Sequence, residues 1–363
     1  METPARLPLS LRHSRSMKLV LREIALPMRR IFRIAHGETI VQTNLLVELH
    51  DGHLRGYGEG ASLDYYGITA LSMRKALEAV RAEIEGARWD RPEELWEQMA
   101  PKLNRNRFSL CALDEAAYDL WGKRLGQPVY KLLGLELGRV PLSNYTLGID
   151  TVEKMVMNLK EFDGWPIYKI KLGTSDDLKI VRELRRHTTA VFRVDANCAW
   201  TAEQTIAFAP ELKTLGVELI EQPLPADAWD DMKQVYAQST LPLIADESCV
   251  IEGDVERCRR FFHGVNIKLT KAGGLTPARR MIERARRLGL KTMVGCMYET
   301  SVGISAIAQL LPLLDYVDMD GAQLLARDIA SGVRVEKGRA IFPDENGNGV
   351  RLLESDGADA RRL

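Results

Sequence analysis

The chain contains 363 residues, of which 45% are hydrophobic and 28% are charged, as is usual for a water-soluble globular protein. Its 50 lysines and arginines balance 50 aspartates and glutamates, and this net charge of zero argues against nucleic acid or an anionic membrane as a partner. No apolar run is long enough to cross a bilayer, and no apolar stretch follows the basic residues near the N-terminus, so we predict neither a membrane helix nor a secretory signal.

The first elements in chain order are three short strands. They are expected at residues 18–24, 44–49 and 54–59. A turn is expected near Pro27, and Asp51-Gly52 marks a hairpin turn. Residues 1–16 are predicted to be an N-terminal extension, which is either a functional tail or a stretch upstream of a true start at Met17.

Helices are expected next, because apolar residues recur at helical spacing over 68–84, 92–99 and 109–125. Strands followed by helices indicate an α+β domain, which we place at residues 17–130.

Five later segments share one design, a short apolar strand that ends in charged residues. They are residues 167–171, 191–197, 217–221, 243–247 and 265–268. Stretches of helical length separate them, which indicates parallel βαβ units. The residues that mark the strand ends, spaced 22 to 26 positions apart, are Lys171, Asp195, Glu221, Asp246 and Lys268. In a closed barrel of the (β/α)8 type these ends meet at one mouth, where active sites lie.

We place the barrel at residues 131–329, with further strands at 142–147, 290–295 and 316–320. The chain length suits a barrel of about 250 residues plus a smaller domain. Residues 330–363 contain turns and short strands and are expected to fold back on the first domain. The predicted fold class is α/β.

Three carboxylates on successive strand ends, Asp195, Glu221 and Asp246, would repel one another in a low-dielectric mouth. A divalent cation removes this repulsion, and ligation by oxygen alone suits Mg2+. The alternative is that each carboxylate caps the helix that follows it.

Lysines flank these carboxylates. Lys169 and Lys171 are two positions apart on one strand and point to the same side, the barrel interior. Burial and a like-charged neighbour are expected to lower a lysine pKa, as a general base requires. Lys268 is expected on the far side of the mouth, so the two lysines could remove a proton from one face of a carbon and return it to the other. The alternative is that the lysines only balance the carboxylates.

The combined motifs resemble the enolase superfamily and, within it, the muconate-lactonising-enzyme subgroup. They are Tyr168-Lys169-Ile170-Lys171-Leu172-Gly173, Val194-Asp195-Ala196-Asn197, Glu221-Gln222-Pro223, Ala245-Asp246-Glu247-Ser248 and residues 266–274. The resemblance covers about residues 17–350. It implies a modified (β/α)7β barrel of the TIM type under an α+β capping domain. It also implies Asp195, Glu221 and Asp246 as Mg2+ ligands, Lys171 and Lys268 as acid/base catalysts, and Lys169 as a residue that tunes Lys171.

The motif Asp318-Met319-Asp320-Gly321 resembles that of the dipeptide epimerases. In that family the two aspartates hold the ammonium group of a dipeptide, and two carboxylates on one face suit such a group. The alternative is a solvated surface loop. Further expected substrate contacts are Thr146, Cys296, Met297 and Tyr298.

The sequence departs from the Ala-Glu epimerases in the first capping loop, residues 33–39. Where those enzymes have an arginine that pairs with the substrate glutamate, this chain has Gly37 or Glu38. We therefore do not expect acidic dipeptides to be preferred. Asp64-Tyr65-Tyr66 in the second capping loop could favour aromatic or cationic side chains.

The resemblance thus implies a Mg2+-dependent isomerase that inverts the α-carbon of the C-terminal residue of a dipeptide through an enediolate. The alternatives are another reaction of the subgroup, namely N-succinylamino acid racemisation, o-succinylbenzoate synthesis or muconate cycloisomerisation, and a catalytically inactive barrel with a binding or structural role. We expect a homo-oligomer. The five scattered cysteines include no Cys-x-x-Cys pair, which indicates reduced thiols and a cytoplasmic location.

Overall fold

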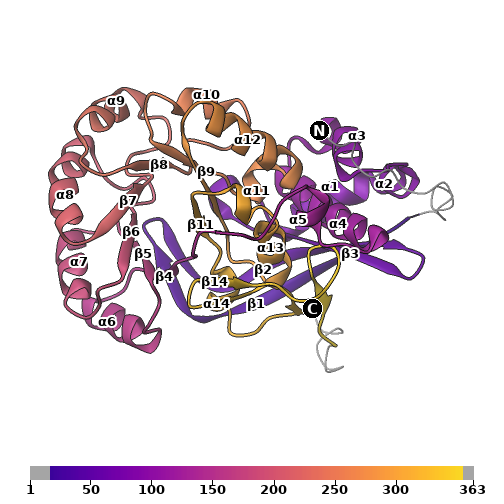
Figure 1. Cartoon of the computed structure of the whole chain (residues 1–363), viewed down its shortest axis with the longest axis horizontal. Helices are drawn as coiled ribbons and strands as arrows, with labels where there is room; N and C mark the ends of the chain where they lie inside the picture. Colours follow the sequence, from indigo (N-terminus) through magenta and orange to yellow (C-terminus); the bar gives the residue numbers. More distant parts are fainter. Residues whose placement is uncertain (1–16, 355–363) are drawn as a thin grey trace.

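The computed structural model describes residues 17–354, so the predicted extension at 1–16 lies outside the described part of the chain. Figure 1 shows a barrel of parallel strands with helices around it, and a smaller unit of three long strands and several helices packed against the barrel. The predicted class, an α/β barrel with an α+β capping domain, is confirmed.

The sheet of the capping unit is antiparallel, in the order β1-β2-β3. Its strands are β1 (Lys18–Ile34), β2 (Gly37–Asp51) and β3 (Leu54–Ala61). The turn expected at Pro27 is wrong, because β1 continues past it with a register shift between Pro27 and Phe32. Proline has no N–H to donate to the ladder, so the strand bulges there without ending.

The helices of the capping unit follow β3. They are α1 (Ala70–Ala79), α2 (Arg81–Gly86), α3 (Pro92–Leu103), α4 (Arg107–Leu125) and α5 (Val129–Leu132), and a short 3-10 helix, η2 (Asp64–Tyr66), precedes them. The single helix expected over 68–84 is wrong. Val80, at φ −120° and ψ 18°, separates α1 from α2 because it lacks the helical backbone conformation.

The barrel sheet has eight strands in the order β11-β10-β9-β8-β7-β6-β5-β4, and every pair is parallel. They are β4 (Tyr145–Leu147), β5 (Ile167–Lys171), β6 (Val191–Asp195), β7 (Val217–Glu221), β8 (Leu243–Ala245), β9 (Gly264–Asn266), β10 (Lys291–Gly295) and β11 (Tyr316–Asp318). A parallel bridge between Ser143 and Val317 joins the two end strands and closes the barrel.

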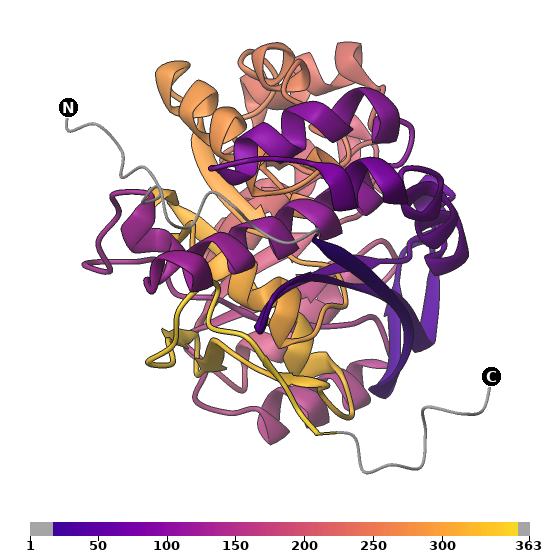
Figure 2. The same cartoon turned by 90° about the vertical axis from the view of Figure 1, so that its right-hand side faces the viewer.

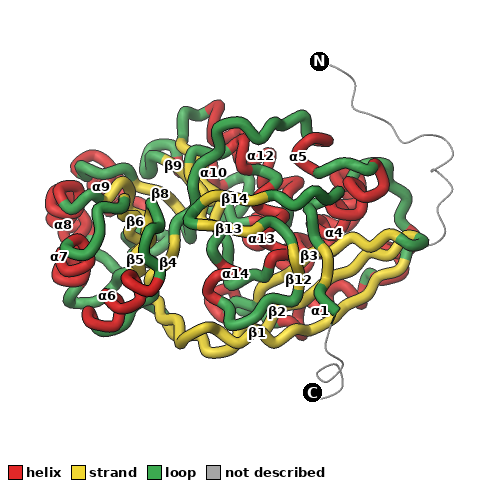
Figure 3. The backbone as a smooth tube through the Cα atoms, turned by 60° about the horizontal axis from the view of Figure 1, so that its bottom comes forward, coloured by secondary structure: helices red, strands yellow, loops and turns green. Residues whose placement is uncertain are grey.

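Helices surround the barrel, as the tube in Figure 3 also shows. The longer ones are α6 (Val152–Glu161), α7 (Asp177–Arg185), α8 (Ala202–Thr214), α9 (Trp229–Gln238), α12 (Leu275–Arg287) and α13 (Ser301–Ala308). The shorter ones are α10 (Asp254–Cys258), α11 (Leu269–Ala272), η3 (Leu311–Leu313) and α14 (Gly321–Leu324). No helix in the described part of the chain is both long and apolar enough to cross a membrane.

The last described residues contact helix α4 of the capping unit. Two small antiparallel pairs form there, β12 (Ala330–Ser331) with β15 (Arg351–Leu352), and β13 (Arg334–Glu336) with β14 (Arg339–Ile341). The backbone N–H of Asn348 donates to Asp119 of α4 at 2.8 Å, and Lys123 of α4 donates to the carbonyl of Val350 at 3.0 Å. Figure 2 shows this C-terminal segment, in yellow, beside the capping strands.

Candidate active site

A cavity of about 110 Å³, called here the inner cavity, lies where the C-terminal ends of the barrel strands face the capping loops. The capping unit lines it with Phe32, Ile34, His36, Ser62, Leu63, Tyr65 and Tyr66. The barrel lines it with Thr146, Lys169, Lys171, Asn197, Asp246, Glu247, Lys268, Cys296, Met297, Tyr298, Asp318, Asp320 and Leu324. Most of the predicted site residues therefore converge on one space, and Asp195 and Glu221 lie directly behind the lysines.

Lys169 is the centre of the charged cluster. Its Nζ lies 2.9 Å from Asp195 Oδ2, 2.8 Å from Glu221 Oε2 and 2.8 Å from Asp318 Oδ2, and its side chain is only 1% exposed. A buried ammonium needs several acceptors to offset its lost hydration, and three carboxylates provide them. Lys169 thus connects two of the predicted metal ligands with one of the two aspartates predicted to hold an ammonium group.

The two predicted acid/base lysines pair with different carboxylates. Lys171 Nζ donates to Asp195 Oδ2 at 2.6 Å, and Lys268 Nζ lies 2.9 Å from Asp246 Oδ2. Lys171 ends β5, whereas Lys268 lies two residues beyond β9, four strands away in an eight-stranded barrel. The two amines therefore approach the inner cavity from opposite sides.

The alternative in which each carboxylate caps the following helix is wrong. The N-cap residues of α8, α9 and α10 are Thr201, Ala228 and Gly253. The carboxylates of the predicted metal ligands instead face the lysines of the barrel interior.

Two residues that hold the carboxylates in place were given no role by the sequence. Lys271 donates to the Asp246 side chain and, at 2.5 Å, to the Asp246 carbonyl, and Asn266 Nδ2 donates to Glu221 Oε1 at 2.8 Å. Asn266 ends β9 and Lys271 lies in α11, and only the fold shows which carboxylate each one contacts. The sequence feature that could have indicated a role for Lys271 is its position three residues after Lys268.

The expectation that burial lowers the lysine pKa is wrong for Lys169. Burial by itself lowers this pKa, but Asp195, Asp318 and Glu221 raise it by more, so the pKa lies well above its ordinary value. The pKa of Lys268 is also raised, because burial lowers it but Asp246, Glu221 and Glu247 together raise it by more. In the same way, Lys268 and Lys271 hold the pKa of Asp246 well below its usual range although burial opposes this.

Whether these residues suit Mg2+ can be judged from buried oxygen atoms that accept no hydrogen bond, because buried polar atoms normally have a partner. Within residues 17–354, such atoms at the strand ends of β6, β7 and β8 are Asn197 Oδ1, Glu221 Oε2 and Glu247 Oε2. Glu221 Oε2 has Lys169 beside it, but outside hydrogen-bond geometry. Carboxylate and amide oxygens are the donors that Mg2+ prefers. Oxygen donors of these types suit Mg2+, and Glu221 is the one of the three predicted ligands that has such an atom.

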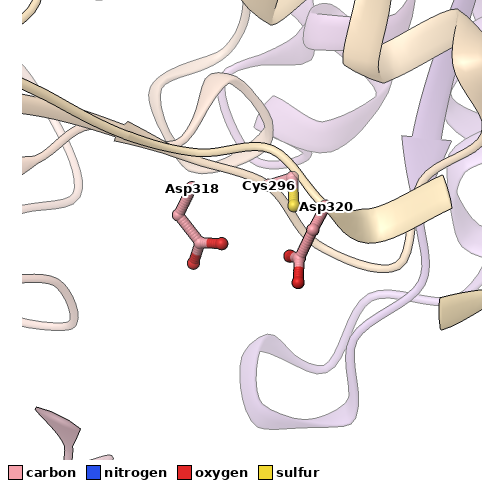
Figure 4. A group of neighbouring side chains, drawn as sticks. All are labelled: Cys296, Asp318 and Asp320. Carbon is pink, nitrogen blue, oxygen red and sulfur yellow. The ribbon is translucent and has the colours of Figure 1, made fainter. Parts of the chain in front are cut away.

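Asp318 and Asp320 lie side by side with Cys296, as Figure 4 shows. One carboxylate oxygen of Asp318, one of Asp320 and Cys296 Sγ all lie within 4.8 Å of one another. Asp195, Glu221 and Asp246 do not form such a close group. Asp318 Oδ1 accepts from Asn144 Nδ2 at 2.8 Å, and Asp320 accepts from the backbone N–H of Thr146 at 2.5 Å. Both aspartates are at least 95% buried, so the alternative of a solvated surface loop is wrong.

The pKa values of the two aspartates are shifted in opposite directions. Burial and the neighbouring Asp318 raise the pKa of Asp320 well above its ordinary value. Lys169 holds the pKa of Asp318 low against the effect of burial. A cation that enters between them would lower both pKa values and so favour the ionised pair. Asn144 was missed by the sequence analysis, which had no signal for it.

The capping loops close the other side of the inner cavity. His36 Nε2 makes a hydrogen bond with the carbonyl of Asn197, and its ring lies 6.1 Å from that of Tyr65. Arg33, in contrast, pairs with Glu38 at 2.8 Å and Asp150 at 3.4 Å, outside the inner cavity. No arginine among residues 17–354 lines the inner cavity, which agrees with the departure seen in this loop.

Comparison with known proteins gives the class. Residues 17–134 match the family model for the N-terminal domain of the mandelate racemase / muconate lactonizing enzyme group, and residues 152–356 match the enolase C-terminal domain-like model. With its eight-stranded parallel barrel and antiparallel capping sheet, the chain is a member of the enolase superfamily.

Individual relatives narrow this class. The L-Ala-D/L-amino acid epimerases of Maribacter sp. and Flavobacterium johnsoniae are 55% and 52% identical to the chain over 93% of its length, covering 99% and 100% of those proteins. The solved dipeptide epimerase of Methylococcus capsulatus, in complex with Mg and L-Arg-D-Lys, is 30% identical with a TM-score of 0.85, over 93% of this chain and 99% of that one. The chain belongs to the dipeptide epimerase family and is an isomerase.

Proposed function

We propose that this protein is a Mg2+-dependent dipeptide epimerase that inverts the α-carbon of the C-terminal residue by a two-lysine 1,1-proton transfer. The observation that carries the proposal is the position of Lys171 and Lys268. They line one cavity from strands on opposite sides of the barrel, and each is paired with a different carboxylate. A mechanism with a single catalytic base would not require two lysines on opposite sides of the cavity.

The two lysines divide the proton transfer. As a free amine, one Nζ removes the α-proton, and the other, as an ammonium, delivers a proton to the opposite face of the resulting enediolate. Exchange of these roles gives the reverse reaction. Lys169 is held by three carboxylates, so we assign it no proton transfer and propose that it adds positive charge near Lys171.

The proposed Mg2+ ligands are Asp195, Glu221 and Asp246. When bound, the ion would stabilise negative charge on the substrate carboxylate and neutralise the protein carboxylates that raise the pKa values of Lys169 and Lys268. The Methylococcus relative solved with Mg and a dipeptide supports this cofactor.

The other end of the dipeptide is assigned to Asp318 and Asp320. An ammonium group forms charge-assisted hydrogen bonds with two carboxylates on one face, as this pair presents. Thr146 fixes Asp320 through its backbone N–H, and Cys296 lies beside the pair. Met297 and Tyr298, which also line the inner cavity, complete the predicted substrate contacts.

The side-chain preference follows from the capping loops. Leu63, Tyr66 and Ile34 form an apolar wall, and no arginine lines the inner cavity in the described part of the chain. An acidic side chain placed against this wall would find no arginine to pair with, and burying an unpaired carboxylate is costly. We therefore propose neutral C-terminal residues, in line with the relatives whose name specifies D/L-amino acids rather than glutamate.

The proposal is tested with a dipeptide library in D2O, with Mg2+ and with EDTA. The expected result is deuterium uptake at the α-carbon of the C-terminal residue together with conversion of L,L- into L,D-dipeptides, both dependent on Mg2+. If no dipeptide exchanges an α-proton in the presence of Mg2+, the proposed function is excluded.

The variant Asp320→Asn separates the proposal from the other reactions of the subgroup. Substrates of N-succinylamino acid racemases, o-succinylbenzoate synthases and muconate cycloisomerases have no free ammonium for this aspartate. Loss of one charge-assisted contact should reduce kcat/KM for dipeptides by about 10- to 100-fold. Activity that is unchanged by the substitution would favour one of those other reactions.

Three further assignments are proposed with this function. They are a cytoplasmic location, a homo-oligomeric state, and domain limits at residues 17–130, 131–329 and 330–363. The five cysteines of the described residues are free thiols, which supports the first of these.

A further inference from the structure

A second, larger cavity of about 460 Å³ lies beside the inner one and is called here the outer cavity. It is bounded by residues 29–33 of β1, by residues 148–150 after β4, and by α6. In the described part of the chain, Phe32 alone lines both cavities. Its ring contacts Tyr298, which lines the inner cavity, and lies near Gly148, which lines the outer one, so we take the ring as the wall between them.

The Phe32 ring is held firmly in this wall. The residue is 5% exposed, and its ring packs edge-to-face against Tyr298 with a centroid distance of 5.4 Å. On the other side, Gly148 approaches so closely that an added Cβ would lie 3.3 Å from Phe32 Cδ2. The N–H of Ile149 donates to the carbonyl of Arg33 at 2.8 Å and ties the two segments together.

The wall stands next to the proposed ammonium site. Gly148 comes two residues after Thr146, which donates to Asp320. Tyr298 comes two residues after Cys296, which lies with Asp318 and Asp320. The segments that grip Phe32 are thus the same ones that shape the site for the first residue of a dipeptide.

An N-terminal ammonium held at Asp318 and Asp320 leaves little choice for the side chain on the adjacent carbon. That side chain is attached to the same carbon as the ammonium group. It therefore has to lie against the apolar surface beside the two carboxylates. Of the apolar residues that line the inner cavity, Leu324 follows Asp320 by four residues, and Phe32 packs on Tyr298, two residues after Cys296. The small volume of this cavity limits how large the side chain can be.

We propose that Phe32 sets the size of the N-terminal side chain that the enzyme accepts, by closing the inner cavity against the outer one. This inference rests on the proposed function, because it needs the dipeptide ammonium at Asp318 and Asp320. Removal of the ring would join the two cavities and give a bulky first side chain access to the larger space. Phe32 is thus a specificity-determining residue for the first position of the substrate.

The test compares wild type, Phe32→Leu and Phe32→Ala on four dipeptides that share a C-terminal leucine and begin with alanine, valine, leucine or phenylalanine. The readout is kcat/KM for α-proton exchange in D2O. The wild type should lose activity as the first side chain grows. Phe32→Ala should raise kcat/KM for Phe-Leu relative to Ala-Leu by at least about tenfold, the usual range for a changed apolar pocket, and Phe32→Leu should change it in the same direction by less.

Ile34→Ala is the matched control. Ile34 lines the inner cavity but not the outer one, so its truncation adds space without joining the cavities. It should leave the preference for the first residue as in the wild type. An unchanged preference in both Phe32 variants, or an equal change in Ile34→Ala, overturns the inference. Phe32→Leu keeps most of the apolar volume and provides the answer if Phe32→Ala does not fold.

A failure of the proposed function can be distinguished from a failure of the inference about Phe32. If the wild type exchanges no α-proton, calorimetric titration of the same four dipeptides onto wild type and Phe32→Leu reads the size preference directly. Binding with a relaxed preference in the variant supports the role of Phe32 without epimerisation. Absence of binding for all four dipeptides overturns both proposals.

Discussion

At the scale of single residues, the inner cavity is a network of buried opposite charges. Lys169 contacts Asp195, Glu221 and Asp318, whereas Lys171 shares only Asp195 with it. A buried lysine with three acceptors is a fixed ammonium, because loss of its proton would leave the carboxylates uncompensated. All three lysines line the cavity, but Lys171 and Lys268 each have a single carboxylate partner, so we propose these two as the amines that exchange a proton with a substrate.

Lys171→Ala and Lys268→Ala should each reduce epimerisation by about 100- to 10,000-fold, the usual effect of removing a general acid or base. Each variant keeps one lysine, so each should still exchange the α-proton of one diastereomer of the dipeptide, and the two variants should differ in which one. Proton NMR of L,L- and L,D-dipeptides in D2O makes this measurement. Full epimerisation by either variant would contradict the two-base mechanism.

At the scale of elements, β3 and α4 pack backbone against backbone. The glycines of β3 that face α4 are Gly56, Gly58 and Gly60. A Cβ on Gly58 would overlap the carbonyl oxygen of Ala112 and lie 2.7 Å from the nitrogen of Ala116. Both atoms belong to the backbone of α4, which cannot move aside as a side chain could. This contact holds the capping sheet on α4 and so positions the loops that close the inner cavity.

Gly58→Ala should therefore lower the free energy of unfolding by about 3 kcal/mol or more, the upper range for overpacking a core. Gly86→Ala is the control, because a Cβ at the end of α2 meets no atom within 4 Å. It should change stability by less than about 1 kcal/mol, with the sign that helix propensity favours. Urea denaturation of both variants measures the difference, and equal effects would mean that the close approach is not limiting.

At the scale of the whole molecule, buried carboxyl groups join the capping unit to the barrel. Glu59 of β3 accepts from Thr300 Oγ1 at 2.6 Å and from the N–H of Gly303 at 3.3 Å, both from the barrel side. Asp114 of α4 accepts from Thr276 Oγ1 at 2.9 Å. Burial raises the pKa of Glu59 to about 7 and that of Asp114 to about 8 despite these hydrogen bonds.

These shifts give the stability a pH dependence of definite sign. The folded protein keeps the Glu59 proton up to about pH 7, whereas the unfolded chain loses it near 4.5. The stabilisation is complete below the Glu59 pKa of the unfolded chain. It is lost as the pH rises through the Glu59 pKa of the folded protein. Glu59 alone should lower the free energy of unfolding by about 3 kcal/mol over this window, and Asp114 acts in the same direction.

Urea denaturation at several pH values between about 5 and 8, with EDTA to remove divalent ions, tests this expectation. Glu59→Gln cannot ionise and should show a shallower fall of stability with pH, although its overall stability is lower because an acceptor is lost. Stability of the wild type that is constant or rises across this range would contradict the expected sign.

The amino-acid sequence alone was sufficient to predict the alternation of strands and helices, and to predict the charged residues at the strand ends from Lys171 to Lys268. This is because strand and helix periods are local properties of the chain, and a charged residue at the end of an apolar strand is visible without a partner. Local patterns also misled at Pro27 and at Val80, where packing of neighbouring strands and helices decided the outcome.

Only the tertiary structure decided which groups meet. It joined Lys169 to Asp318, which are 149 residues apart, and this choice of partners reversed the expected direction of the lysine pKa. It also placed Phe32 between two cavities, next to Gly148 and Tyr298. Coulombic attraction, burial and cavity walls depend on distances between remote segments, and those distances exist only once the chain has closed into a barrel under its cap.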